Sequence, residues 1–172
     1  MRRKIFIAVT IIICFLLQST VFQRLSFVSI SPNLLIVVTA AFGFMRGRKE
    51  GLFVGFFCGL LMDVFFGPVL GIYALLYMYV GFINGIFKKI FYPEDVKLPI
   101  FLMAVSDLSF NIIIYFGMFL FRGRFEFGYY FVHVMIPELV YTMIVAVVIY
   151  FILLKINQKL EEIEKRSAKK FV

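Results

Sequence analysis

Apolar residues occur in six long runs along the chain, and short polar segments separate them. The runs cover residues 5–22, 32–45, 51–66, 69–87, 99–121 and 129–154. A helix of about 20 apolar residues crosses the hydrocarbon core of a bilayer. The pattern therefore predicts an all-α polytopic membrane protein with about six transmembrane helices, in which residues 1–154 form a single membrane domain. The first run lacks a small-x-small cleavage site, so we expect it to be retained as a helix.

Two of the runs are short for a membrane span. At about 1.5 Å per residue, residues 32–45 and 51–66 give helices of roughly 21 and 24 Å, against a hydrocarbon core of about 30 Å. Either flanking residues lengthen these helices, or this part of the bundle lies in a thinned or protein-covered zone. Ser31, Pro32 and Asn33 mark the start of the second helix, because serine caps helices and proline fits the first turn. A polar turn is expected at residues 46–50.

Glycine recurs at four-residue intervals in the third predicted helix. Gly51, Gly55 and Gly59 occupy successive positions of this series, and Asp63 takes the next one. Four residues are close to one helical turn, so the glycines form a groove along one face. The fourth helix carries its own pair, which consists of Gly81 and Gly85. Small residues at this spacing let membrane helices approach closely. They predict packing within this chain, docking of a separate subunit's helix, or both at different ends of the strip.

The distribution of charge indicates how the helices are oriented. The chain has 18 lysines and arginines and a net charge of +8. With a cytoplasmic N-terminus, the cytoplasmic segments hold three of these cations at the N-terminus, three at 46–49, three at 88–97 and six in the tail. Only Arg24, Arg122 and Arg124 then lie outside. This excess of positive charge predicts cytoplasmic termini. Residues 155–172 are expected to form a basic tail that begins as a continuation of the last helix. Anionic membrane lipid is a sufficient partner for the lysines of this tail.

Composition excludes several classes of protein. Hydrophobic residues make up 63% of the chain, against roughly 45–50% in a soluble domain, and a small globule cannot bury that excess. The cations lie between apolar runs rather than on one face, which argues against nucleic-acid binding. The single histidine provides neither a metal site nor a catalytic dyad. No phosphate-binding glycine loop is present, and we expect no enzyme, cofactor or metal site.

Three carboxylates fall within the predicted spans: Asp63, Asp107 and Glu138. Each costs at least about 2–3 kcal/mol if placed charged in lipid, so each should face protein or water. Asp107 and Glu138 are expected near mid-depth, with Asn111 close by. Pro137 is expected to kink the last helix beside Glu138. These carboxylates either line a cavity that forms a proton or cation path, or they join the helices as structural polar groups. Asp63 is expected to accept hydrogen bonds from the start of the next helix.

Three segments stand out by their order and spacing. They are SPNLL at 31–35, EGLFVGFFCGLLMDVFFGPVLGIYALLY at 50–77 and PELVYT at 137–142. In this arrangement the chain resembles the rod shape-determining protein MreD family of bacteria. Length, helix count and predicted termini agree with that family, so the resemblance covers essentially the whole chain.

The resemblance implies a non-enzymatic scaffold subunit of the elongasome in the bacterial inner membrane, which supports cell shape and lateral-wall peptidoglycan synthesis. It implies binding to the single-pass protein MreC, and action with MreB, RodA and a class-B penicillin-binding protein. The family is also similar in fold to the S components of energy-coupling-factor vitamin transporters, which implies that Asp63, Asp107 and Glu138 line a central cavity. Two alternatives stay open, namely an S-component-like uptake subunit for a small molecule and a proton-coupled transporter.

Overall fold

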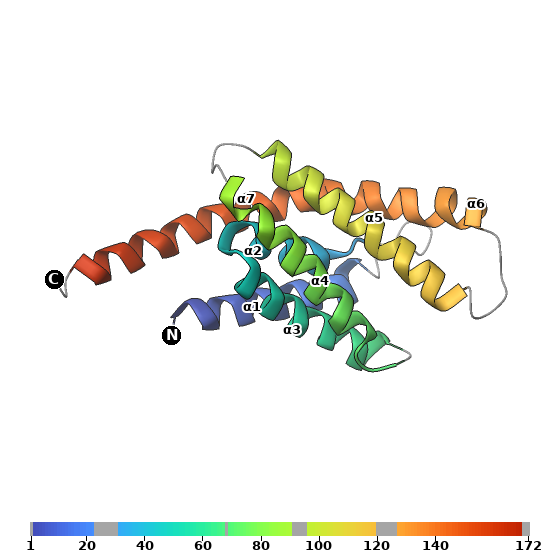
Figure 1. The fold of residues 1–172 in the computed structure, drawn as a ribbon, viewed down its shortest axis with the longest axis horizontal. Helices are drawn as coiled ribbons and strands as arrows, with labels where there is room; N and C mark the ends of the chain where they lie inside the picture. The colour runs from blue at the N-terminus through green and yellow to red at the C-terminus, as the bar shows by residue number, and fades with distance from the viewer. Residues whose placement is uncertain (1, 23–30, 68, 91–95, 120–126, 170–172) are drawn as a thin grey trace.

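The protein is almost wholly helical, which confirms the predicted all-α class. The computed structural model describes residues 2–22, 31–67, 69–90, 96–119 and 127–169 (Figure 1). The helices are α1 (Arg2–Leu16), α2 (Leu34–Arg46), α3 (Arg48–Phe66), α4 (Ile72–Ile86), α5 (Lys97–Phe119), α6 (Phe127–Tyr130) and α7 (Ile136–Lys169). A π-helical turn, Leu17–Phe22, follows α1, a 3-10 turn, Phe87–Ile90, follows α4, and a second π-helical turn, Phe131–Met135, precedes α7. The described residues contain no strand.

Helix α2 is the centre of the bundle. It contacts α1, α3, α4, α5 and α7, and every residue from Leu34 to Met45 is buried. A helix that is apolar on all sides must be surrounded by protein or lipid, and here protein surrounds it. Helix α2 has only 13 residues, which is short for a membrane span. Of the arrangements expected for a short helix, α2 adopts the one in which protein covers it.

Three helical stretches of the described chain are long and apolar enough to cross a membrane. They are Lys4–Val21, Lys97–Gly117 and Gly128–Glu162. Large apolar side chains on them, such as Ile12, Phe101 and Ile144, are exposed, as expected for contact with lipid. These helices establish a helical membrane protein. The count of six spans stays a prediction, because α2 and α4 have only 13 and 15 residues.

The connection between α2 and α3 is shorter than predicted. Helix α2 ends at Arg46 and α3 begins at Arg48, so the polar turn expected over residues 46–50 consists of Gly47 alone. Gly47 has φ 102° and ψ −178°, a backbone conformation essentially restricted to glycine. Because this one residue turns the chain, the charged residues that follow it form the first turn of α3.

Helices α3 and α4 meet backbone to backbone along their glycines. A Cβ added at Gly51 would collide with the carbonyl oxygen of Gly81, and one added at Gly85 would collide with the backbone of Arg48. The same geometry extends into α2, because a Cβ at Gly43 would lie 2.6 Å from the Gly81 oxygen. Glycine therefore allows three helices to meet at one point.

The glycine strip of α3 continues along α4. A Cβ at Gly55 would collide with the carbonyl oxygen of Tyr77, and one at Gly59 would lie 2.5 Å from that of Tyr73. All five glycines singled out in the sequence thus lie at contacts within the chain. The alternative, in which a separate subunit's helix occupies the strip of α3, is not compatible with this packing because α4 already fills it.

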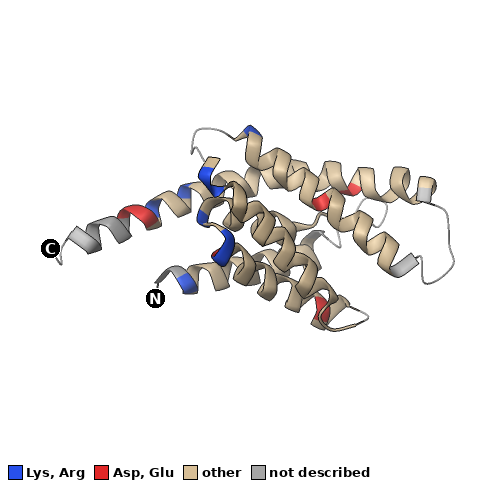
Figure 2. Cartoon of the chain, in the orientation of Figure 1, with Lys and Arg blue, Asp and Glu red and all other residues tan. Residues whose placement is uncertain are grey.

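Basic side chains gather at one end of the bundle. Both chain termini lie at this end (Figure 1), and the lysines and arginines of the described residues are concentrated there (Figure 2). Helix α7 continues past the bundle to Lys169, which confirms the predicted helical continuation into the tail. Arg24, Arg122 and Arg124, the cations expected on the opposite side, lie outside the described residues.

Replacing Gly59 by alanine should destabilise the protein, because the added Cβ has to push α4 away. Overpacking of this kind costs about 1–3 kcal/mol. Cys14 and Cys58 are free and buried, so their reaction with a thiol-reactive fluorogenic dye during heating reports unfolding. We expect the midpoint of dye reaction to fall by several degrees.

Gly117→Ala in α5 is the matched control, because nothing lies within 4 Å of a Cβ at that position. Helix propensity favours alanine over glycine at both sites, so only the close contact with α4 predicts a loss of thermal stability in Gly59→Ala. Equal midpoints for the two variants would contradict the close packing of α3 against α4.

Candidate functional site

The start of α2 lies inside the bundle, where its unpaired backbone N–H groups need partners from the protein. Asn33, which is 5% exposed, is the N-cap, and its Oδ1 accepts a hydrogen bond from the Ile36 N–H at 3.3 Å. The Tyr77 hydroxyl of α4 donates to the same oxygen at 2.8 Å. The helix starts at Leu34, directly after the predicted tripeptide. Asn33 is the cap instead of Ser31, because its amide oxygen reaches the first turn. Pro32 precedes the helix instead of lying in its first turn.

Two more helices supply partners to the same helix start. The Leu35 N–H donates to Oε1 of Gln18 at 3.2 Å, and Gln18 belongs to the π-helical turn after α1. The Asn33 N–H donates to Oγ1 of Thr142 in α7 at 3.1 Å. Side chains from the π-helical turn after α1, from α4 and from α7 therefore converge on the start of α2. We refer to Gln18, Asn33, Tyr77 and Thr142 as the α2 polar cluster.

Sequence reasoning identified Asn33 but missed the other three members of the α2 polar cluster. Gln18 and Thr142 are polar residues inside apolar runs, which is the signal that marks a buried partner in a membrane protein. Asn84 of α4 carries the same signal and was also missed. Its Nδ2 donates to the Val80 carbonyl at 2.8 Å and to the Ser106 hydroxyl of α5 at 2.7 Å.

Asp63 joins the end of α3 to the start of α4. Its carboxylate accepts hydrogen bonds from the backbone N–H groups of Gly71 at 2.9 Å, Tyr73 at 3.0 Å and Ala74 at 2.9 Å. These are donors at the start of a helix, where a carboxylate also interacts favourably with the helix dipole. The prediction that Asp63 accepts hydrogen bonds from the next helix is confirmed. Pro68, in the connection between the two helices, lies outside the described residues.

A second acidic group lies between α5 and α7. Asp107 is fully buried and interacts electrostatically with Glu138. Asn111 follows Asp107 by one helical turn and lies next to Glu138. Neither oxygen of Asp107 nor Nδ2 of Asn111 makes a hydrogen bond of acceptable geometry within the described part of the chain. Asp107, Asn111 and Glu138 therefore form a polar site with unused hydrogen-bonding capacity, and Asp63 is not part of it.

Pro137 lies at a change of helix type next to this acidic group. The π-helical turn Phe131–Met135 ends with a hydrogen bond from the Ile136 N–H to the Phe131 carbonyl, five residues back. Pro137 follows directly, inside the continuous helical stretch Gly128–Glu162. The mid-span position predicted for this proline is therefore confirmed. The hydrogen-bonding pattern changes from π to α immediately before the proline, and π turns are frequent near functional sites. The predicted kink stays a prediction.

The chemistry available to these sites is hydrogen bonding and proton exchange. The described residues contain no group of three or more His, Cys, Asp or Glu side chains that could hold a metal ion. Both carboxylate oxygens of Asp63 accept hydrogen bonds from backbone N–H groups at the start of α4, whereas neither oxygen of Asp107 has a hydrogen-bond partner among the described residues. A structural role fits Asp63, and the pair is the group on which a proton-linked role depends.

The family described as rod shape-determining protein MreD matches residues 1–160. No curated protein and no solved structure matches the chain.

Replacing Asp63 by alanine should loosen the first turn of α4, because three backbone donors lose their acceptor. Loss of a capping side chain costs about 0.5–2 kcal/mol. Hydrogen exchange measured by mass spectrometry should show faster exchange for peptides that contain Tyr73 and Ala74, with peptides of α5 unchanged. Asp63→Asn keeps one acceptor oxygen and should give an intermediate rate, whereas wild-type exchange in Asp63→Ala would contradict the capping role.

Proposed function

The chain belongs to the rod shape-determining protein MreD family, and we propose that it acts as a non-enzymatic scaffold of the elongasome in the bacterial inner membrane. In this role it binds an MreC-like single-pass protein through its membrane helices. Through that partner it supports MreB, RodA and a class-B penicillin-binding protein during lateral-wall peptidoglycan synthesis. The observation that carries the proposal is the family match over residues 1–160.

The packing of the bundle supports a scaffold. Helices α2, α3 and α4 are held together by backbone contacts at glycines, and the α2 polar cluster ties them to α1 and α7. A protein packed in this way presents fixed outer faces to its neighbours. Because α4 fills the glycine strip, the partner's helix is proposed to pack on an outer face of the bundle.

The orientation in the membrane is part of the proposal. Residues 1–154 form the membrane domain with six spans, an architecture like that of S components, and residues 155–172 form the cytoplasmic tail. The gathering of cations at the end that carries both termini (Figure 2) supports cytoplasmic termini. The salt bridge between Arg46 and Glu161, at 3.7 Å, ties the end of α2 to the beginning of the tail.

Co-purification with the MreC-like protein of the same bacterium tests the scaffold role. The tagged chain should retain this partner in a constant ratio, and it should restore rod shape to cells depleted of their own MreD. The double variant Asp107→Asn, Glu138→Gln should keep both properties, because a scaffold needs the shape of the acidic pair and not its proton. Gly59→Leu, which cannot fit against α4, should lose both.

Two results would contradict the scaffold role. If the double variant keeps the partner but fails to restore rod shape, the acidic pair carries a proton-linked activity and the transporter alternative holds. If the purified chain carries a stoichiometric small molecule and no single-pass partner, the S-component-like uptake alternative holds.

A further inference from the structure

The acidic pair between α5 and α7 has no cation to balance its charge. Asp107 of α5 is 0% exposed, Glu138 of α7 is partly exposed, and the two side chains interact electrostatically. No lysine, arginine or histidine of the described residues interacts with either carboxyl group. The acidic positions of these two helices also lie away from the end of the bundle at which the cations gather (Figure 2). The scaffold role uses only the shape of this pair and leaves its charge unexplained.

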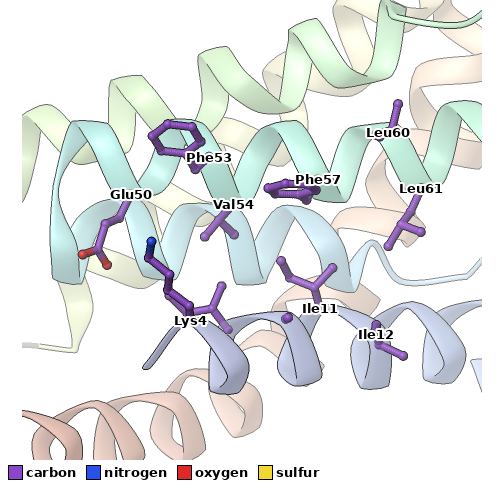
Figure 3. A pocket seen from close by; sticks show the side chains of 11 residues that line it. Lys4, Ile11, Ile12, Glu50, Phe53, Val54, Phe57, Leu60 and Leu61 are labelled. Atoms are coloured by element: carbon purple, nitrogen blue, oxygen red, sulfur yellow. The ribbon is translucent and has the colours of Figure 1, made fainter. Parts of the chain in front are cut away.

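The pair is distinct from the apolar groove on the outside of the bundle. That groove has a volume of about 540 Å³ and lies between α1 and α3 (Figure 3). The residues that line it belong to those two helices, whereas the pair belongs to α5 and α7. The acidic pair is therefore a separate site.

Asp107 is buried without a hydrogen-bond donor. Neither of its oxygens has a hydrogen-bond partner within the part of the chain that the structure describes. An ionised carboxylate at this position would have lost its water and gained neither a donor nor a positive charge, which is among the most costly states of a buried group. The Asp107 carboxyl group therefore requires a proton of its own.

The polar groups around the pair do not provide that proton. The Tyr77 hydroxyl of α4 lies near both carboxyl groups, but it donates to Oδ1 of Asn33. Helix α2, which contacts α5 and α7, contributes no titratable side chain from Leu34 to Met45.

The remaining titratable neighbours are tyrosines, none of which carries a positive charge. Tyr130 of α6 interacts with Glu138, and Tyr73 and Tyr115 interact in turn with Tyr130. No neighbour in the described chain therefore neutralises a charge on Asp107.

Asn111 gives a second, independent indication of a ligand at this site. Its side chain is 8% exposed, and its Nδ2 makes no hydrogen bond of acceptable geometry within the described residues. A buried amide N–H group in that state is rare. Asn111 lies one turn after Asp107 on the same face of α5 and next to Glu138. An ionised Glu138 is the acceptor that lies beside this amide group.

One proton accounts for the whole arrangement. An ionised carboxylate only accepts hydrogen bonds, whereas a protonated carboxyl group also donates one. Like charges close together at low dielectric oppose each other's ionisation, so a pair of carboxyl groups can hold one proton. The proton belongs on Asp107, which is fully buried. Glu138 is partly exposed and has the amide group of Asn111 beside it, and a neighbouring donor favours a charged carboxylate.

We propose that Asp107 and Glu138 form a proton-binding site in which Asp107 is the protonated member at neutral pH. The carboxylic acid of Asp107 donates a hydrogen bond to the Glu138 carboxylate, and this bond joins α5 to α7 inside the bundle. The proposal does not depend on which partner the chain binds. It agrees with the behaviour expected of the double variant Asp107→Asn, Glu138→Gln, because an amide has the shape of a protonated carboxyl group and can donate in its place.

Infrared spectroscopy of the wild-type protein tests the proposal directly. A protonated carboxyl group has a C=O stretching band that is separate from the bands of carboxylates and backbone amides, and exchange into D₂O shifts it. In a detergent without ester groups and at neutral pH, where a solvated carboxyl group is ionised, we expect one such band. Labelling aspartate with ¹³C should move the band to lower frequency, and labelling glutamate should leave it in place.

Three variants assign the band to one residue, because the chain has three aspartates, Asp63, Asp95 and Asp107. Asp107→Asn should abolish the band. Glu138→Gln should keep the band but shift it, because the acceptor of the Asp107 hydrogen bond changes from a carboxylate to an amide. Asp63→Asn is the matched control, since Asp63 accepts hydrogen bonds from three backbone N–H groups, and it should leave the band unchanged.

Each other outcome would overturn the proposal. Absence of the band in the wild-type protein would mean that both members of the pair are ionised. A band that moves on labelling of glutamate, survives in Asp107→Asn or disappears in Glu138→Gln would place the proton on Glu138. Separate bands from aspartate and glutamate would mean that both members are protonated. The labelling experiments use the wild-type chain, so their result does not depend on the folding of any variant.

Discussion

The burial of α2 is the constraint on which the rest of the structure depends. A helix start buried inside a membrane bundle has no water to satisfy its backbone donors, so the protein must supply every partner. The side chain of Asn33, directly before the helix, accepts a hydrogen bond from one of these backbone donors. Gln18 and Thr142, which are far from α2 in the sequence, accept hydrogen bonds from two others. Together with the hydrogen bond from the Tyr77 hydroxyl to Asn33, these hydrogen bonds tie the π-helical turn after α1, helix α4 and helix α7 to the start of α2.

Glycine allows the close helix packing that the central position of α2 requires. Lipid offers no hydrophobic drive for two helices to associate, so close packing has to provide the attraction. Gly43, Gly51 and Gly81 bring α2, α3 and α4 to a common contact, and Asp63 closes the far end of the α3–α4 pair. The inner helices are thus committed to one another, which leaves the outer faces of α1, α5 and α7 for lipid and for the partners of a shape-determining protein.

The sequence predicts local features of this protein well. Apolar runs locate the helices, glycine spacing locates the α3–α4 contact, and the position of Asp63 one turn after Gly59 predicts a link to the next helix. The arrangement of the helices in space is not available in the same way. That α2 is central depends on contacts between residues far apart in the chain, such as Asn33 with Thr142. Gly47 as a complete turn and the π turn before Pro137 depend on backbone geometry that no residue pattern reveals.

The free energy of unfolding of Asn33→Ala, measured by sodium dodecyl sulfate titration in mixed micelles, tests the central role of the α2 start most directly. Removing Oδ1 leaves the Ile36 N–H and the Tyr77 hydroxyl without their acceptor, which should cost about 2 kcal/mol. Asn111→Ala is the matched comparison, because the Asn111 side chain is also buried but its Nδ2 makes no hydrogen bond of acceptable geometry within the described chain. We expect Asn33→Ala to lose clearly more free energy of unfolding than Asn111→Ala does. A loss in Asn33→Ala that is equal to or smaller than the loss in Asn111→Ala would contradict the central role of the α2 start.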